Sequence, residues 1–380
     1  MSLAGLHNLG SSNERDDHHR IGCPRLSSVG ARRYRDGLVG GRRRVRLMEV
    51  PEFVSVLTEF AAFQRDVVNA DQAQVDLARE RRDAFLTAFS AEDDVVETFC
   101  SGSLRRRTQL RPIHDVDLVI VYRQENHPDW GSPGTSSEDA MRHVQSRVTA
   151  LLGQSSDSPL VRITRVSGRG RSVKCFIDTT DTSKTDAFTV DAMPVLRNEC
   201  GTLLLPSQHD EAWSEADPEF LINEVRARQS EWSHFRQTVR LLKYWARQRA
   251  SVPVKSLVVE VLALRHLPTD AGNVPEALRR FFTAAAATVS DGVEDPAGFC
   301  GPIQLDLDDL ALRSALELAA DHAEKALVAT SLNDQDTAIS HWREVLGPEF
   351  APDFDGKSAG KAASATPVAA RRPVRDAPQG

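Results

Sequence analysis

The sequence has 380 residues, 41% of them hydrophobic and 27% charged, which is the ordinary balance of a soluble globular protein. No apolar run approaches the roughly 20 residues needed to cross a bilayer, and the N-terminus lacks the apolar stretch of a signal peptide. The five cysteines are far apart and form no CxxC pair, so we expect neither a disulfide framework nor a zinc ribbon, and we expect a cytoplasmic location.

The net charge of −7 is unevenly distributed along the chain. Residues 1–47 hold ten arginines and four acidic residues, and residues 355–380 hold five basic and two acidic residues, which leaves a net charge of −16 between them. Affinity for nucleic-acid backbone comes mainly from neutralising phosphates. We therefore do not expect this acidic body to bind long DNA or RNA.

The N-terminal segment changes character near Met48. Residues 1–47 are rich in Arg, Gly and Ser without a sustained period, so we predict disorder; the segment is either a flexible basic arm or lies upstream of a true start at Met48. The pattern from Pro51 to about Ser90 is helical, and Asp71 is a plausible N-cap. The apolar stripe of this region consists of Val75, Ala78, Phe85 and Phe89.

A mixed region follows, from about Val95 to Leu205. Its apolar runs predict strands at Asp117–Tyr122, Val173–Ile177 and Phe188–Val195. Between them, His127–Ser137 is a Pro/Gly/Ser loop and Glu138–Leu152 has the pattern of a helix.

From Trp213 onward the chain is predicted to be almost wholly helical. Asp217-Pro218 is a favourable helix start, because a capping residue precedes a proline in the first turn. Further helices are expected at 232–250, 255–266, 274–289, 307–331 and 334–346, and the low-complexity tail from Asp355 is predicted to be disordered. The expected organisation is α+β, with an N-terminal helix and mixed α/β core over 48–205, a helical lobe over 206–354, and disordered ends at 1–47 and 355–380.

The first candidate site is the pair Asp115 and Asp117. Residues i and i+2 of a strand point to the same face, and two carboxylates that close repel each other unless a cation lies between them. Carboxylate oxygens suit Mg²⁺ or Mn²⁺. Upstream, Gly102 and Ser103 would offer backbone N–H groups and a hydroxyl to a triphosphate if they open a short helix.

A third carboxylate strengthens this interpretation. Asp191 lies in an apolar strand, where an isolated charge is costly unless it is paired or bound to metal. Three carboxylates on neighbouring strands would form a two-metal site, in which one metal activates a hydroxyl and the other holds a triphosphate. Asp191 would then be well placed to take a proton from an attacking 2′- or 3′-hydroxyl.

These motifs carry a resemblance to a known family. GSLRRRTQLRPIHDVDLVIVY, with FTVDAMPVL about seventy residues later, resembles the polymerase-β-like nucleotidyltransferases. More narrowly, the later stretches RQTVRLLKYWARQRASVPVKSLVVEVLAL and AISHWREVLGPEF look like the helical lobe of the bacterial CD-NTases, relatives of cyclic GMP-AMP synthase and 2′-5′-oligoadenylate synthase. The resemblance covers roughly Val54 to Phe350.

The resemblance implies a fold, an activity and ligands. The fold would be a nucleotidyltransferase palm packed on a C-terminal helical bundle. The activity would be joining nucleoside triphosphates into a cyclic second messenger of anti-phage defence, which acts through a downstream effector. Asp115 and Asp117 would bind both Mg²⁺ or Mn²⁺ ions, and Asp191 would complete the coordination shell of the first ion.

A basic helix face could serve the same site. Arg236, Arg240, Lys243 and Arg247 fall at i, i+4, i+7 and i+11, opposite an apolar face, and would receive triphosphate if they face the carboxylates. The alternative is a solvated charged face. By resemblance, Lys243 and Ser256 match the Lys and Ser that hold the donor's phosphates in this family.

Residues next to these motifs are weaker candidates for the site. His114 either tunes the site or only enters the strand, and Arg105 to Arg107 either contact phosphate or are solvated, while Thr108 is expected to hold the turn. No Cys/His cluster matches the zinc insertion of the animal sensor, so we expect no zinc and no activation by long DNA.

The tail ends at Gly380, which would suit linkage by a ubiquitin-conjugation-like partner encoded beside some synthases of this family.

Two other functions stay open from sequence alone. One is a template-independent RNA-tailing nucleotidyltransferase of the CCA-adding or poly(A) type, although the acidic body counts against it. The other is a catalytically silent nucleotide-binding scaffold, which three intact carboxylates disfavour.

Overall fold

The computed structural model describes residues 55–166, 170–207, 212–250 and 252–354. The predicted disordered ends, including Met48 and Gly380, lie outside the described residues.

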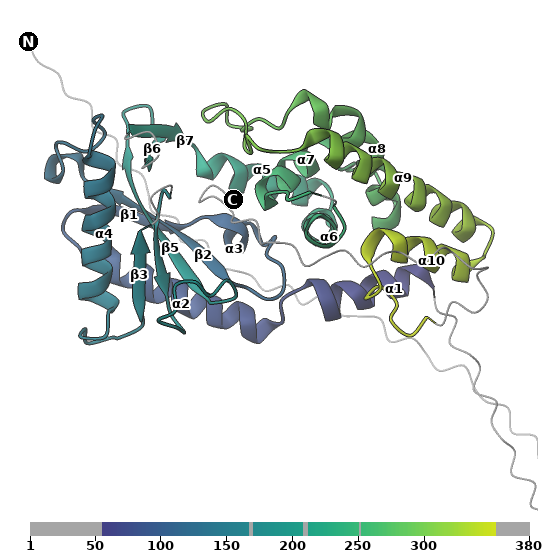
Figure 1. Cartoon of the computed structure of the whole chain (residues 1–380), viewed down its shortest axis with the longest axis horizontal. Coiled ribbons are helices and arrows are strands. Elements are labelled where there is room, and N and C mark those ends of the chain that lie inside the picture. The colour runs from purple at the N-terminus through teal and green to yellow at the C-terminus, as the bar shows by residue number, and fades with distance from the viewer. Residues whose placement is uncertain (1–54, 167–169, 208–211, 251, 355–380) are drawn as a thin grey trace, which may run out of the picture. The chain divides into compact units, whose positions relative to one another are not determined.

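The first half of the described chain contains both strands and helices, and helices follow one another in the second (Figure 1). The strands are β1 Val95–Cys100, β2 Asp115–Tyr122, β3 Ile163–Val166, β4 Val173–Phe176, β5 Thr189–Arg197, β6 Leu203–Ser207 and β7 Ala212–Ala216. The α-helices are α1 Val56–Phe63, α2 Gln72–Ser90, α3 Gly102–Arg106, α4 Ser136–Leu152, α5 Pro218–Glu231, α6 Phe235–Gln248, α7 Ser256–His266, α8 Val274–Thr288, α9 Asp309–Ser331 and α10 Gln335–Leu346.

The strands form one mixed sheet in the order β1-β2-β5-β4-β3, and β6 pairs with both β5 and β7. The central pair β2 and β5 is parallel, whereas β1, β4 and β6 run antiparallel to their neighbours. In the parallel register Asp117 lies opposite Asp191, and Asp115 lies opposite Thr189. The central strands therefore bring together residues that are more than seventy positions apart in the sequence.

Strand alternation divides the sheet residues between two faces. Leu118 and Ile120 of β2 belong to the core that the sheet shares with α2 and α4. Val119, Val121 and Met193 belong to a second, smaller cluster on the opposite face. The three aspartates share the parity of this second set, so they lie on the face away from α2 and α4.

The predicted helical pattern over Pro51–Ser90 is interrupted in the structure. A π-helical turn at Gln64–Val68 ends the first part, and α2 begins after Asp71, whose side chain accepts a hydrogen bond from the Gln74 backbone N–H. The predicted N-cap is thus confirmed. Residues of α1 pack with the C-terminal helices, and the Phe60 ring meets those of Trp342 and Phe350 at 4.9 Å.

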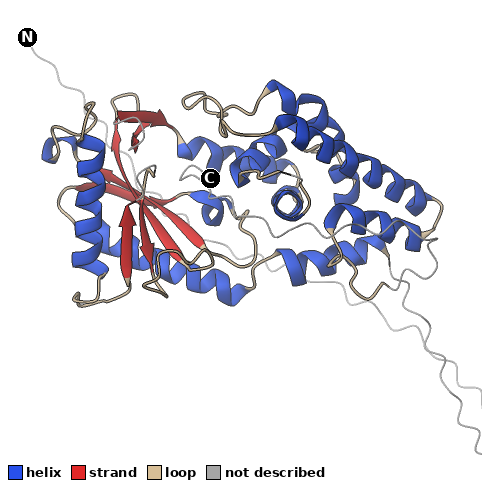
Figure 2. Ribbon diagram, in the orientation of Figure 1, coloured by secondary structure: helices blue, strands red, loops and turns tan. Residues whose placement is uncertain are grey.

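The helices from α5 on gather apart from the strands and share one apolar core (Figure 2). Asp217 caps α5 by accepting from the backbone N–H groups of Glu219 and Phe220, which confirms the predicted start. The prediction of an almost wholly helical chain from Trp213 was wrong at its first step, because Ala212–Ala216 pairs with β6 and extends the sheet. Short strands of this kind are set by their partner more than by their own pattern. Within the described residues, no helix is both long and apolar enough to span a bilayer.

Candidate active site

The three aspartates meet on adjacent strands at one end of the parallel β2–β5 pair. Asp117 and Asp191 are ladder neighbours, and Asp115 precedes Asp117 by two residues on the same face. Asp117 is 6% exposed and Asp191 is 9% exposed, while Asp115 is partly exposed. The structure thus brings together the three carboxylates that the sequence singled out.

The surroundings of Asp117 and Asp191 disfavour the ionised form of both carboxylates. Burial raises the pKa of Asp117 well above its usual range, and the charges of Asp115 and Asp191 raise it further, against the opposing effects of Arg106 and Lys174. Burial also raises the pKa of Asp191, which Lys174 counteracts. A divalent cation would supply the missing positive charge, and an all-oxygen donor set is the chemistry that Mg²⁺ or Mn²⁺ prefers.

Helix α3 packs directly against this cluster. A short helix opens at Gly102, which has a positive φ of 66°, so the condition set for the Gly-Ser turn is met. A Cβ atom at this position would lie 1.6 Å from the Asp117 Oδ2 atom. The backbone N–H of Ser101 donates to the Asp117 carbonyl at 2.9 Å. Glycine is therefore required both by the backbone conformation and by the approach of the carboxylate. Ser103, the next residue, is partly exposed.

Lys174 is a member of the site that sequence reasoning missed. It lies opposite Asp191 in the antiparallel β4–β5 register, and its Nζ atom is 3.1 Å from Asp191 Oδ1. The same ammonium group donates to Thr189 Oγ1 at 3.3 Å. A signal was present in the sequence, because a lysine within the apolar run Val173–Ile177 requires a partner.

A second buried cluster surrounds Glu260 of α7. Arg106 Nε donates to Glu260 Oε2 at 2.7 Å, and Lys243 Nζ contacts Oε1 at 3.0 Å. Thr108 Oγ1 donates to the same Oε1 atom at 2.9 Å. Burial alone would raise the pKa of Glu260, but Arg106 and Lys243 lower it to about 2. This cluster links the segment after the Gly-Ser turn to helices α6 and α7.

Several sequence-predicted residues therefore have protein partners. Lys243, the expected phosphate ligand, is 5% exposed and ion-paired with Glu260. Arg106, one of the three arginines whose role the sequence did not decide, is buried in the same cluster. The Thr108 N–H donates to the Ser103 carbonyl oxygen at 3.0 Å, which holds the turn. His114 Nδ1 lies 3.2 Å from the Asp186 carbonyl oxygen.

The basic positions of α6 do not form a uniform stripe. Arg240 donates to Asn69 Oδ1 and to the Arg107 carbonyl, both at 2.7 Å, and burial with the nearby charge of Arg236 lowers its pKa to about 10. Arg247 is exposed. Ser256 is the first residue of α7 and is partly exposed, one helical turn before Glu260.

An open, mainly apolar hollow adjoins this region. Ser101 and Arg106 border it on the side of α3, and Asp217 and Asp295 add polar groups to its wall. The remaining lining is mostly apolar and includes Met193, Leu205, Pro218, Phe220, Leu257 and Ile303. Concave apolar surfaces with a few polar groups are typical of small-molecule sites.

Comparison with known proteins gives a consistent result. The chain is 24% identical over 290 residues to a cyclic AMP-AMP-AMP synthase from Acinetobacter sp., which covers 70% of this chain and 76% of the relative. It is 25% identical over 329 residues to a probable cyclic nucleotide synthase from Bacillus cereus, covering 76% and 95% of the two chains. No protein-family model matches the chain.

Solved structures agree with these relatives at the level of fold. The E. coli CdnC in a complex with HORMA-deltaN superposes with a TM-score of 0.60 at 22% identity, over 77% of this chain and 98% of that one. The CD-NTase CdnG of Bradyrhizobium diazoefficiens superposes with a TM-score of 0.54 at 11% identity, over 76% and 95% of the two chains. The chain is thus similar in sequence to curated cyclic nucleotide synthases and similar in fold to the CD-NTase CdnG. The predicted α+β class, a mixed sheet with a helical C-terminal region, is confirmed.

Proposed function

We propose that this chain condenses nucleoside triphosphates into a cyclic di- or trinucleotide with release of pyrophosphate, and that the product is a second messenger in cytoplasmic anti-phage defence. The observation that carries the proposal is the juxtaposition of Asp115, Asp117 and Asp191 with too little positive charge to balance them. The relationship to cyclic nucleotide synthases gives this site its reaction class.

Asp115, Asp117 and Asp191 would hold the Mg²⁺ or Mn²⁺ ions. When bound, these cations would lower the pKa of the attacking hydroxyl and stabilise negative charge on the departing pyrophosphate. Asp115 and Asp117 would contribute ligands to both ions, and Asp191 would complete the shell of the first.

Asp191 also has the environment of a general base. Its raised pKa, caused mainly by burial, makes the carboxylate a better acceptor of the proton from a 2′- or 3′-hydroxyl. Lys174 at 3.1 Å opposes this effect and favours the ionised carboxylate. The pair would thus set the basicity of Asp191 between that of a solvated and that of an isolated buried aspartate.

Gly102, Ser103 and the Glu260 cluster would receive the triphosphate. Glu260 is contacted by two cationic side chains, so the cluster carries a surplus positive charge. We propose that this surplus, with Arg240 and the Ser256 hydroxyl, attracts the phosphates, and that Lys243 shares its three donors between Glu260 and a phosphate oxygen.

A protein partner is also part of the proposal. One structural neighbour was solved as a complex of CdnC with HORMA-deltaN, which favours regulation of this chain by a protein. Linkage of Gly380 by a ubiquitin-conjugation-like partner is the other route. Deleting Gly380 in cells that carry the neighbouring genes would abolish a higher-mass conjugate if linkage occurs, whereas capture of an unmodified complex by both forms of the chain would favour non-covalent regulation.

The direct test is a product assay. The purified chain would be incubated with all four nucleoside triphosphates and Mg²⁺ or Mn²⁺, treated with phosphatase, and analysed for resistant products by mass spectrometry. We expect a resistant cyclic product that is absent with Asp117→Ala. Extension of an added RNA acceptor without a resistant product would overturn the proposal in favour of a tailing enzyme, and nucleotide binding without metal-dependent pyrophosphate release, in the presence of the partner, would favour a silent scaffold.

A further inference from the structure

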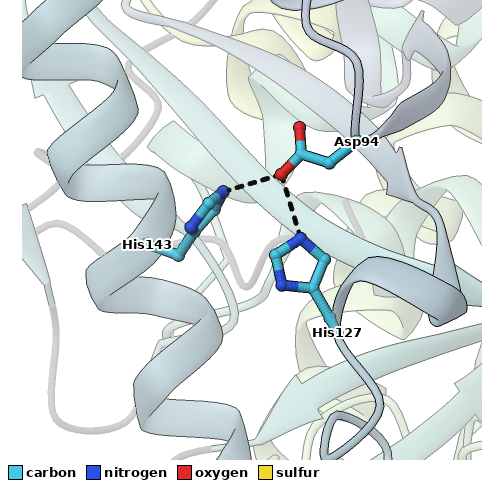
Figure 3. Close-up of side chains that lie close together, drawn as sticks. All are labelled: Asp94, His127 and His143. Atoms are coloured by element: carbon cyan, nitrogen blue, oxygen red, sulfur yellow. Dashed lines mark hydrogen bonds and ion pairs between the residues drawn. The ribbon is translucent and has the colours of Figure 1, made fainter.

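A second cluster of metal-ligating side chains lies outside the candidate active site. Asp94 is in the turn between α2 and β1, His127 follows the 3₁₀ turn Gln124–Asn126, and His143 is on α4. Figure 3 shows both imidazoles directed at one carboxylate oxygen. The Nε2 atoms of His127 and His143 lie 3.0 Å and 3.2 Å from Asp94 Oδ2.

The dimensions of this cluster fit a tetrahedral metal ion. Ligand atoms about 2.0–2.1 Å from a tetrahedral Zn²⁺ lie roughly 3.3–3.4 Å from one another. The two observed nitrogen-to-oxygen separations are close to that edge length, and the three ligand atoms all lie within 4.8 Å of one another.

Aromatic rings pack around the ligands, and two polar atoms of the described residues there make no hydrogen bond. The Trp130 ring stacks on His127 with centroids 3.9 Å apart, and the Tyr122 ring makes T-shaped contacts with both imidazoles at centroid distances of 5.3 Å. The buried Tyr122 hydroxyl has no hydrogen-bond partner among the described residues, and the contact from His143 Nε2 to Asp94 lacks hydrogen-bond geometry. Buried polar groups of this kind normally have partners.

The nearby charges also suit a cation. Arg147 acts on His143, but its guanidinium is ion-paired with Glu92.

We propose that Asp94, His127 and His143 bind one divalent transition-metal ion, of which Zn²⁺ is the best match. Two imidazoles and one carboxylate form a set that zinc prefers and that Mg²⁺ does not. The expectation of no zinc rested on the absence of a sequence motif, but these ligands come from segments that only the fold brings together. The proposal is independent of the proposed function.

The position of the site indicates a structural role. Tyr122 ends β2, and Asp117 lies five residues earlier, so the two sites are about 17 Å apart along an extended strand. The ion would join the turn before β1, the loop after β2 and helix α4. It would thereby hold the end of β2 that lies opposite the end carrying the active-site aspartates.

The test uses the full chain, stripped of metal with a chelator and kept in excess Mg²⁺. Zn²⁺ would be titrated into a form carrying Asp115→Asn and Asp117→Asn, so that the active-site carboxylates do not contribute. We expect one Zn²⁺ per chain and a higher melting temperature on binding. In the same background, His127→Asn with His143→Asn should weaken binding by more than about 100-fold, because even loss of an outer partner of a metal ligand costs about 10–100-fold.

The matched control removes two other facing histidines. His322 Nδ1 and His341 Nδ1 lie 3.2 Å apart without belonging to a three-ligand group among the described residues. His322→Asn with His341→Asn should leave the Zn²⁺ affinity of the proposed site unchanged. Equal loss in both double variants, or no stoichiometric Zn²⁺ binding by the parent chain, would overturn the proposal.

A gain-of-signal variant guards against misfolding. His143→Cys keeps a ligand at the same position and should produce a thiolate-to-Co²⁺ charge-transfer band when Co²⁺ replaces Zn²⁺. Absence of this band in a folded His143→Cys chain would also contradict the assignment.

Discussion

Two buried carboxylate clusters lie close together in this protein and have opposite charge balance. Around Asp117 three carboxylates face a short supply of cations, and the pKa of Asp117 is raised. Around Glu260 two cations and a hydroxyl surround one carboxylate, whose pKa falls to about 2. Burial acts in the same direction on both, so the number and sign of the neighbours decides the difference.

The comparison separates a carboxylate that lacks counter-charge from one that is fully compensated. Glu260 is balanced by two cations and joins α6 and α7 to the segment after the Gly-Ser turn, and the second cation leaves the cluster one positive charge for phosphate. The Asp117 cluster is incomplete without an added cation. We expect substitution of Glu260 to affect mainly stability and substitutions in the Asp117 cluster to affect mainly activity.

The largest effect is expected at Asp117. Asp117→Ala should lower cyclic-product formation by roughly a thousandfold or more, equivalent to about 4 kcal/mol of transition-state stabilisation. The free energy of unfolding without metal should not fall, because the change removes a carboxylate with raised pKa from an acidic cluster. Initial rates and urea unfolding would be measured together.

The control for this variant is Asp321→Ala, which removes an exposed partner of Lys325. It should leave the rate unchanged. An Asp117→Ala protein that keeps a tenth of the parent activity would refute the metal assignment.

The reverse outcome is expected at Glu260. Glu260→Gln leaves Arg106 and Lys243 buried without a counter-charge, so the free energy of unfolding should fall by about 3–5 kcal/mol. Glu317→Gln, which breaks an exposed pair with Arg313, should cost only about 0.2–1 kcal/mol. Equal losses in urea unfolding would contradict the view of Glu260 as a structural joint.

The pH dependence of the free energy of unfolding should report the same stabilising role of Glu260. Because the pKa of Glu260 is lowered from 4.5 to about 2, its contribution is fully present above pH 4.5 and is lost as the pH falls toward 2. The stability difference between the parent chain and Glu260→Gln should therefore shrink by about 3 kcal/mol over this range. A stability difference that stays constant as the pH is lowered through this range would show that Glu260 does not titrate in this way.

Gly102 tests how closely α3 must approach the carboxylates. In Gly102→Ala the new Cβ would overlap Asp117 Oδ2 and displace it, and a misplacement near 1 Å costs about 100-fold in rate. Gly134→Ala shares the positive φ but has open space around the added atom, so it should leave the rate unchanged. A similar small effect of both changes on product formation would mean that the close approach is unimportant.

The smallest effect is expected at Lys174. Lys174→Met removes the partly exposed cation beside Asp191, and such pairs are worth about 0.2–1 kcal/mol, or up to about fivefold in rate. The loss should be greatest at low Mg²⁺, where the ammonium is the main counter-charge. Lys184→Met, beside Asp186 at 3.9 Å, serves as the control, and an identical Mg²⁺ dependence in both would remove Lys174 from the site.

The sequence determined the elements whose signal is local. The helix caps at Asp71 and Asp217 and the strand from Asp117 to Tyr122 follow from capping chemistry and apolar runs, which depend on neighbouring residues alone. The shared face of Asp115 and Asp117 follows in the same way from the two-residue period of a strand. The short strand β7 was missed because its pairing with β6, not its own pattern, makes it a strand.

Only the tertiary structure decided which charges meet. It placed Asp191 opposite Asp117, gave Lys243 to Glu260 rather than to open solvent, and joined His127 and His143 to Asp94. The environment of a charge is set by whatever packs against it, and partners such as Arg106 and Glu260 lie 154 residues apart in the chain. A sequence therefore shows which groups can carry chemistry, while the fold decides whether each group is neutralised or left to bind a ligand.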